Sequence, residues 1–227
     1  FKRRFATVNR IKAVLFDMDG TITNTLDDLA DATNYALSAF GFKTHETDAF
    51  RYFVGDGIPK LIERALPEEK RDAETISVVK DKFFEYYNVH SMDKTAAYPG
   101  VPAVVKEVMS LGYKTAVVTN KDEPAAKEIL AKLYPDCFDY IFGASDDIPK
   151  KPDPTLAHIA MKKLGVTPDD CVFVGDSCVD IQTAKNSGAY DVGVSWGFRP
   201  RTELEEYGAT AIIDEPNELI ELLKKLG

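Results

Sequence analysis

The sequence is poor in cysteine. Its 227 residues include only three, Cys137, Cys171 and Cys178, and an odd number without regular spacing fits neither a disulfide framework nor a zinc site. Free thiols are typical of proteins in reducing compartments. The cysteine content therefore predicts a cytoplasmic protein.

Long apolar runs and an excess of positive charge are also absent. No run approaches the ~20 apolar residues of a membrane-spanning helix, so we expect no membrane partner. The chain has 28 lysines and arginines against 37 aspartates and glutamates, a net charge of -9, whereas nucleic-acid-binding proteins favour basic surfaces. We therefore expect no nucleic-acid partner, and an anionic substrate would need local cations or a metal ion.

The sequence does contain short apolar runs that alternate with helical patterns. Continuous apolar runs are typical of strands that are covered on both faces, and alternation with helices predicts a parallel sheet between two helical layers, an α/β fold. The expected strands are residues 13–16, 115–118 and 171–174, with weaker candidates at 192–194 and 211–213; the expected helices are 101–111, 125–133, 156–164 and 219–226.

This alternation is interrupted by a stretch with no strong strand pattern. Between Asn24 and Asp93 the sequence predicts helices at 26–40, 58–65 and 68–89, and Pro99-Gly100 marks the return to the alternating pattern. We therefore expect a small all-helical domain inserted after the first strand. The predicted division is 1–23 with 95–227 for the core and 24–94 for the insert.

Polar clusters follow several of the predicted strands. They are Asp17-Met18-Asp19-Gly20-Thr21, Thr119-Asn120, Lys150-Lys151-Pro152-Asp153-Pro154, and Gly175-Asp176-Ser177 with Asp180. Because ligands bind at the carboxyl ends of the strands in open parallel sheets, we expect these four clusters to meet at one edge.

These clusters resemble a known family. DMDGT, VVTN, KKPDP and VGDSCVD are similar, in order and spacing, to the four motifs of the haloacid dehalogenase superfamily. The resemblance implies a Rossmann-like core, a helical cap after the first strand, a Mg²⁺ cofactor and an aspartate nucleophile. Within the superfamily, VGDGIPKLIERAL, VVTNK and WGFRPRTEL most resemble phosphoglycolate phosphatases, and bacterial pyrophosphatases of the same branch are similar over these stretches.

The resemblance assigns two aspartates to catalysis, and their chemistry fits. Asp17 would attack phosphorus and form an acyl phosphate, which is easier to hydrolyse than the original ester. Asp19 would protonate the leaving oxygen and then activate water. Strand alternation places these two side chains on similar sides of the chain.

Other residues are predicted to hold the phosphoryl group. Lys151 would neutralise the nucleophile and the transferring group, although Lys150 competes for this role and only the lysine–proline spacing favours Lys151. The Thr119 hydroxyl and the Asn120 backbone N–H would bind phosphate oxygens. Gly20 would allow the backbone to approach closely.

A magnesium site is predicted from the same clusters, because Mg²⁺ prefers oxygen ligands. Asp17, Asp176 and the backbone carbonyl of Asp19 are the candidate ligands. Asp180 would orient a metal-bound water or the Asp176 loop, or would simply lie in the first turn of a helix. Ser177 is predicted to cap that helix or to contact the ligand directly.

The insert is expected to select the substrate. Gly55 and Gly57 lie in the candidate substrate-facing loop at residues 52–58, which has the alternative interpretation of an ordinary turn between helices. Asp56 in this loop would oppose an anionic substrate if its side chain pointed inward. Four cations are candidate partners for a substrate carboxylate, with solvated surface as the alternative: Lys60, Arg64, Arg199 and Arg201.

The predicted function is a Mg²⁺-dependent phosphomonoester hydrolase that acts on a small phosphorylated metabolite such as 2-phosphoglycolate. The alternatives are a pyrophosphatase and a sugar-phosphate mutase, which shares the phospho-aspartate but shields it from water. A non-enzymatic binding module is not favoured, because such a module would be expected to have lost an acidic motif. The sequence leaves a monomer or a homodimer open.

Overall fold

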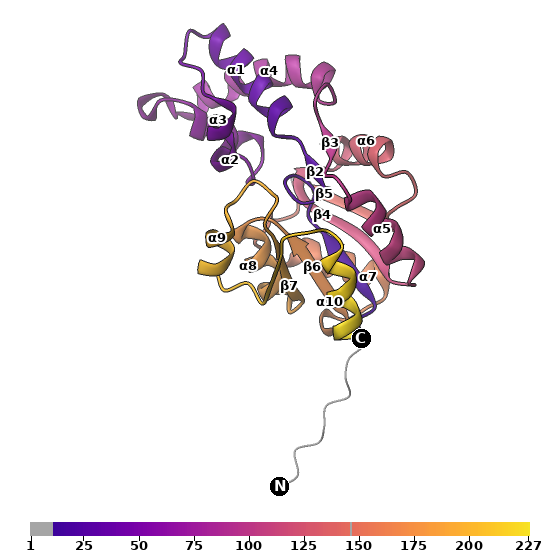
Figure 1. Ribbon diagram of the computed structural model, residues 1–227. Helices are drawn as coiled ribbons and strands as arrows, with labels where there is room; N and C mark the ends of the chain where they lie inside the picture. Colours follow the sequence, from indigo (N-terminus) through magenta and orange to yellow (C-terminus); the bar gives the residue numbers. More distant parts are fainter. Residues whose placement is uncertain (1–10, 146) are drawn as a thin grey trace.

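The core of the molecule is a six-stranded sheet in the order β5-β4-β1-β6-β7-β8 (Figure 1). The computed structural model describes residues 11–145 and 147–227, and all neighbouring strands of this sheet are parallel. The predicted α/β class is therefore confirmed. The strands are β1 (Ala13–Phe16), β4 (Lys114–Asp122), β5 (Tyr140–Ala144), β6 (Cys171–Gly175), β7 (Tyr190–Val194) and β8 (Ala211–Ile213).

Helices cover both faces of the sheet because its strands are apolar on both sides. Val14 and Phe16 of β1 pack in one cluster with residues of α5, α6 and α10, whereas Ala13 and Leu15 pack in another with residues of α7 and α8. Within the described ranges, no helix is both long and apolar enough to cross a membrane. The helices are α5 (Val101–Ser110), α6 (Glu123–Leu133), α7 (Thr155–Leu164), α8 (Cys178–Ser187), α9 (Arg201–Glu206) and α10 (Glu218–Leu226).

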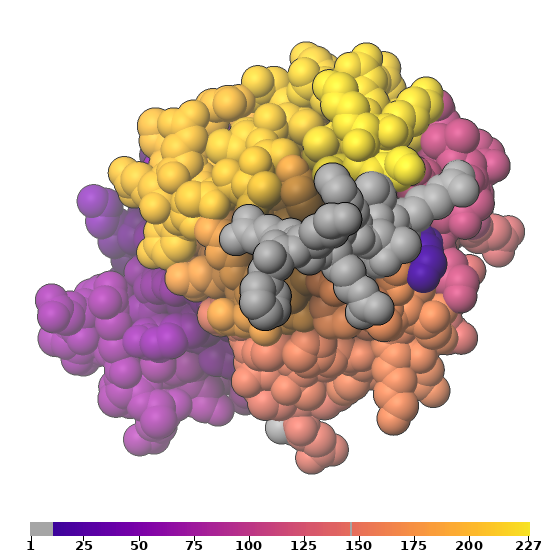
Figure 2. All heavy atoms as spheres, turned by 90° about the horizontal axis from the view of Figure 1, so that it is seen from below, coloured from indigo at the N-terminus to yellow at the C-terminus, as the bar shows by residue number. Residues whose placement is uncertain are grey.

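Four further helices stand beside this core, and we call them the helical insert (Figure 1). They have a hydrophobic cluster of their own that includes Leu29, Phe50, Leu61 and Phe83, and Phe198 of the core packs into it. In the space-filling view from below, the insert, in purple, projects to one side of the core (Figure 2). The helices are α1 (Leu26–Ala39), α2 (Phe50–Phe53), α3 (Ile58–Ala65) and α4 (Ala73–His90).

Two predicted boundaries in the insert are wrong. The helix expected over residues 68–89 begins only at Ala73, because the Asp72 side chain accepts a hydrogen bond from the N–H of Thr75 (2.9 Å) and so caps the helix there. Residues 68–70 form a separate 3-10 turn. The loop expected over 52–58 is shorter, since Tyr52 and Phe53 belong to α2 and Ile58 begins α3.

The chain enters and leaves the insert at one point. The two-residue strands β2 (Thr23–Asn24) and β3 (Ala96–Ala97) pair in antiparallel fashion there. The buried Asp28 carboxylate also accepts hydrogen bonds from the N–H groups of Lys94 (3.0 Å) and Thr95 (2.8 Å). The beginning of α1 is thus fastened to the segment that returns to the core. These contacts lie close to residues 24 and 94, where the sequence predicts the boundaries between the core and the insert. That division of the chain stays a prediction.

Candidate active site

Three buried carboxylates meet at the carboxyl edge of the sheet. Asp17 directly follows β1 and Asp176 directly follows β6, and these two strands are neighbours. Asp180 lies in the first turn of α8. One oxygen from each of the three carboxylates lies within 4.8 Å of the others. The structure therefore brings together three residues that were predicted to bind or orient a metal ion.

Lys151 is the cation of this cluster. Its Nζ lies 2.7 Å from Oδ1 of Asp17 and 2.7 Å from Oδ1 of Asp180, and its side chain is only 2% exposed. Burial opposes a charged lysine, but the two carboxylates raise its pKa above the usual value. Lys150 instead lines the neighbouring pocket. Of the two candidate lysines, Lys151 is therefore the one placed beside the predicted nucleophile.

Asn120 holds the backbone of this lysine in place. Its side-chain oxygen accepts a hydrogen bond from the Lys151 N–H (2.8 Å), and its Nδ2 donates to the Lys151 carbonyl (3.2 Å) and to the Gly55 carbonyl (3.0 Å). Thr119 is buried next to it. The Asn120 side chain thus links the lysine loop to the insert, a role that the sequence did not indicate. The predicted contacts of Thr119 and Asn120 with phosphate stay predictions.

The carboxylate cluster carries more negative charge than Lys151 can neutralise. Burial and the neighbouring Asp180 raise the pKa of Asp17 well above its usual value, and Lys151 opposes this shift. Burial and Asp180 also raise the pKa of Asp176 to about 7. A bound divalent cation would supply the missing positive charge, and an all-oxygen ligand set suits Mg²⁺. The residues present therefore fit the metal ion that the sequence predicts.

The Asp176 carboxylate is oriented by two groups that were not assigned to it from the sequence. It accepts hydrogen bonds from the Thr21 hydroxyl (3.1 Å) and the Phe198 N–H (2.7 Å). A Cβ at Gly20, whose φ is +91°, would lie 2.4 Å from an Asp176 oxygen, and one at Gly197 would lie 2.2 Å from the Asp176 Cβ. Both glycines therefore permit a close approach to Asp176. The role of Gly20 at the phosphoryl group stays a prediction, and Gly197 was not among the predicted site residues.

Asp180 has two sets of partners. One oxygen faces Lys151, and the other accepts hydrogen bonds from the Ser177 N–H (3.1 Å) and the Ser177 hydroxyl (2.6 Å). Asp180 thus lies both in the first turn of a helix and close to Asp17, the predicted nucleophile. Ser177 occupies the N-cap position of α8, as one of its two interpretations predicted.

Asp19 lies apart from the buried cluster. Its Oδ1 accepts a hydrogen bond from the Thr25 hydroxyl (2.8 Å) and lies 3.6 Å from Nζ of Lys121. Its carboxylate does not belong to the group formed by Asp17, Asp176 and Asp180. The two aspartates of the DMDGT motif therefore have different electrostatic surroundings. The role of the Asp19 carbonyl as a metal ligand stays a prediction.

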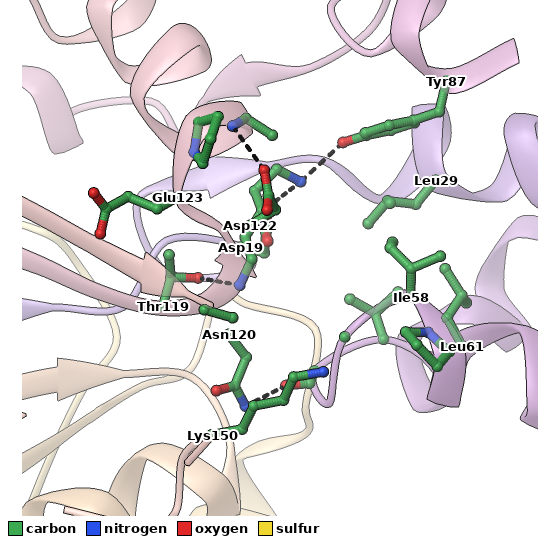
Figure 3. Close-up of a pocket in the computed structure, with 18 of the residues that line it drawn as sticks. Asp19, Leu29, Ile58, Leu61, Tyr87, Thr119, Asn120, Asp122, Glu123 and Lys150 are labelled. Atoms are coloured by element: carbon green, nitrogen blue, oxygen red, sulfur yellow. Dashed lines mark hydrogen bonds and ion pairs between the residues drawn. The ribbon is translucent and has the colours of Figure 1, made fainter. Parts of the chain in front are cut away.

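A pocket of about 740 Å³ lies between the core and the insert (Figure 3). Asp17, Asp19, Thr119 and Asn120 line its core side together with Lys121. The insert contributes an apolar wall, in which Leu29, Ile58 and Leu61 lie opposite Thr119 and Asn120 (Figure 3). The two loop glycines also line the pocket, at φ values of +125° for Gly55 and +87° for Gly57.

The cations of the pocket are not those considered from the sequence. Lys60 pairs with Glu63, Arg64 with Asp56, and Arg201 with Glu205 and Asp214, while Arg199 donates to the Val54 carbonyl. None of the four lines the pocket, and Asp56 is occupied by Arg64. The lysines that do line it are Lys80, Lys121 and Lys150.

Sequence and structure comparisons agree on the kind of protein that this chain resembles. Residues 14–194 match the model of a family described as haloacid dehalogenase-like hydrolase. Over 210 residues the chain is 38% identical to a phosphoglycolate phosphatase of Neisseria meningitidis serogroup A, covering 90% of this chain and 89% of the relative. A phosphoglycolate phosphatase of Psychrobacter arcticus is 33% identical over 220 residues, which cover 93% of this chain and 95% of the relative.

Solved structures show the same architecture. A Lactobacillus delbrueckii subsp. bulgaricus protein, provisionally described as a phosphoglycolate phosphatase, superposes with a TM-score of 0.90 at 34% identity, covering 94% of this chain and 98% of that one. A Bacteroides vulgatus protein, provisionally described as a beta-phosphoglucomutase, superposes with a TM-score of 0.78 at 23% identity, covering 96% of this chain and 90% of that one. The second likeness concerns the fold alone.

Proposed function

Since the chain belongs to the haloacid dehalogenase-like hydrolase family, we propose that it is a Mg²⁺-dependent phosphatase that forms a transient phospho-aspartate on Asp17. The observation that carries this proposal is the surroundings of Asp17. Its carboxylate lies at the end of β1, 2.7 Å from the buried ammonium group of Lys151, and it lines the large pocket beneath the insert. A nucleophile in this position can be reached by a substrate.

The buried carboxylates would hold the metal ion. Asp17 and Asp176 are the proposed side-chain ligands, with the Asp19 carbonyl as a further one and Asp180 in an orienting role. When bound, Mg²⁺ supplies positive charge that lets an anionic carboxylate approach an anionic phosphate ester. Lys151 also supplies positive charge next to Asp17, since its ammonium group lies between the carboxylates of Asp17 and Asp180.

The proposed reaction has two steps. A carboxylate oxygen of Asp17 attacks phosphorus while the bond to the leaving oxygen breaks, and Asp19 donates its proton to that oxygen. Asp19, now a carboxylate, then removes a proton from water, which attacks the phosphorus of phospho-Asp17. This second attack breaks the Asp17–phosphorus bond and releases inorganic phosphate. The Thr119 hydroxyl and the Asn120 N–H are proposed to bind the phosphate oxygens throughout.

The proposed substrate is a small phosphorylated acid such as 2-phosphoglycolate. The names of the 38% and 33% identical relatives support it, and so does the presence of Lys80 and Lys150 around the pocket, which could neutralise a carboxylate of the leaving group. Pyrophosphate and a sugar phosphate remain the alternative substrates. A mutase would transfer the phosphoryl group to a second hydroxyl instead of to water.

The test is phosphate release with Mg²⁺ from phosphoglycolate, pyrophosphate and a sugar phosphate. We expect phosphoglycolate to be hydrolysed with the highest kcat/KM, and we expect Asp17→Asn to abolish release. Intact-mass measurement after rapid acid quench should detect one added phosphoryl group on the wild type and none on Asp17→Asn. Isomerisation of the sugar phosphate that outruns phosphate release would replace the phosphatase with a mutase.

A further inference from the structure

Lys121 is a buried cation at the junction of the core and the insert. It lies near the end of β4, directly after Thr119-Asn120, and its side chain is only 7% exposed. Its Nζ donates a hydrogen bond to the Tyr87 hydroxyl (2.8 Å) and lies 3.6 Å from Oδ1 of Asp19. A buried charge needs such partners, and both of them line the pocket.

The contacts of Asp19 distinguish its two carboxylate oxygens. Oδ1 accepts a hydrogen bond from the Thr25 hydroxyl (2.8 Å) and faces Lys121. Among the residues that the structure describes, none donates a hydrogen bond to Oδ2. One oxygen is therefore anchored while the other is free to exchange a proton with a ligand in the pocket.

Tyr87 makes this anchor depend on the insert. It belongs to α4, is 4% exposed, and stacks on Phe83 with ring centroids 5.0 Å apart. The Lys121 ammonium group lies over the Tyr87 ring, 5.2 Å from its centroid, in addition to their hydrogen bond. The hydrogen bond crosses the pocket edge beside Asp19 (Figure 3). If α4 moved away from the core, Lys121 would lose this partner.

We propose that Lys121 and Tyr87 are positioning residues, which hold Asp19 with Oδ2 directed toward the leaving oxygen only while α4 lies against the core. This inference rests on the proposed function, in which Asp19 is the general acid and base. It explains why a lysine is buried beside a carboxylate that is not part of the metal cluster. The contact between Lys121 and Tyr87 thereby makes proton transfer by Asp19 depend on closure of the insert against the core.

The first test compares two tyrosines on the same helix. Tyr87→Phe removes the hydroxyl that holds Lys121 but keeps the ring, whereas Tyr86→Phe is the matched control, because Tyr86 stacks on Tyr35 and His90 and does not line the pocket. With phosphoglycolate, whose alkoxide leaving group needs a proton, Tyr87→Phe should lower kcat about tenfold. This loss is smaller than the whole rate contribution of a positioned general acid, because Asp19 itself remains. Tyr86→Phe should leave kcat unchanged.

The second measurement uses an ester that needs no proton. The pre-steady-state burst of p-nitrophenolate from p-nitrophenyl phosphate reports the attack by Asp17 alone, and we expect Tyr87→Phe to change its rate less than twofold. Lys121→Met should behave like Tyr87→Phe with a larger loss, and Lys121→Arg should recover part of it. In an Asp19→Asn background, Tyr87→Phe should have no further effect on phosphoglycolate hydrolysis.

The outcomes separate the inference from the proposed function. Equal losses on both substrates, or a Tyr87→Phe effect that persists in full in the Asp19→Asn background, would reduce the pair to a structural contact and overturn the inference. Thermal melting of every variant identifies misfolding, and Tyr87→Phe keeps the test decisive if Lys121→Met does not fold. A wild-type protein that releases no phosphate from either ester would instead refute the proposed function.

Discussion

Lys150 and Lys151 are neighbours in the chain, but their side chains lie in different surroundings. Lys151 is almost fully buried between two carboxylates, and Lys150 reaches toward the insert, where its Nζ lies 3.4 Å from the Asp56 carbonyl. The first therefore contributes to the charge balance of the core, and the second to the wall of the pocket. One position along the chain separates these two roles.

Substitution of each lysine by methionine should reveal this difference. Lys151→Met leaves Asp17 and Asp180 without their buried partner, so the unfolding free energy should fall by about 3–5 kcal/mol, and kcat should fall at least about 10²-fold. Lys150→Met should change stability by no more than about 0.5 kcal/mol and should raise KM rather than lower kcat. Urea unfolding and steady-state kinetics measure both. Similar stabilities of the two variants would contradict the assignment.

Asp170, which lies outside the site, contributes to the stability of the folded state in a pH-dependent way. Its carboxylate pairs with Lys12 (2.8 Å) and accepts hydrogen bonds from the Thr167 N–H (2.9 Å) and hydroxyl (2.7 Å). These partners lower its pKa to about 2. Because the folded-state pKa is depressed, the stabilisation is complete above the unfolded value of about 3.9 and is lost as the pH falls through the folded one.

Asp170→Asn should therefore destabilise the protein at pH 7 relative to the wild type. The difference should persist down to a pH of about 4 and then shrink toward a pH of about 2, as the wild-type carboxylate is protonated. Urea unfolding of both proteins across this range measures it. A difference that is independent of pH would show that the charge of Asp170 does not contribute.

Among the elements, the strands that carry the site could be predicted and one edge strand could not. β1, β4 and β6 are central, so both of their faces are buried, and apolar runs mark β1, β6 and the middle of β4. β5 lies at the edge, is mostly half-buried and contains Gly143. Its short apolar run, Tyr140-Ile141-Phe142, ends at that glycine, and no strand was predicted there. A strand with this composition is defined by its hydrogen bonds to β4, which are long-range contacts.

The Asp28 side chain contributes to the connection between the insert and the core. Asp28 of α1 accepts hydrogen bonds from two backbone N–H groups beyond α4, those of Lys94 and Thr95. Asp28→Ala removes this acceptor and leaves both groups without it, which should cost about 1–3 kcal/mol. Urea unfolding measures the loss, and Asp27→Ala is the control on the same turn. Equal effects of the two substitutions would contradict this role of Asp28.

For the whole molecule, the family and the enzyme class predicted from the sequence, a phosphatase, are confirmed. Asp17, Asp176 and Lys151 could be located because each lies in a motif that follows a strand or adjoins one. Phe198 and Tyr87 could not be connected to the site from the sequence, and Thr21 was expected there only as part of the DMDGT motif. Each contacts a residue far away in the chain, such as Phe198 with Asp176 or Tyr87 with Lys121, and one sequence alone does not contain such pairings.

The charge of the cluster also predicts how the whole molecule responds to metal. The three clustered carboxylates have one ammonium group among them, which pairs with two of the three, so Mg²⁺ should bind the folded state preferentially and raise the melting temperature. At about 100 times the dissociation constant the gain is about 2.7 kcal/mol. Differential scanning calorimetry with Mg²⁺, and with NaCl at matched ionic strength as control, measures it. If Mg²⁺ raised the melting temperature of Asp176→Asn by the same amount, the ion would bind elsewhere. Phosphate release should stop when a chelator is added.

The pairing of β2 with β3 has a consequence for how such proteins diversify. Because Thr23 lies opposite Ala97 in one ladder, the segment between them starts and ends at almost the same place. A segment attached in this way can be lengthened, shortened or replaced as a cassette, while the sheet and its aspartates keep their positions. Recombination at this junction would exchange the apolar wall of the pocket in a single event and leave the six-stranded sheet in place.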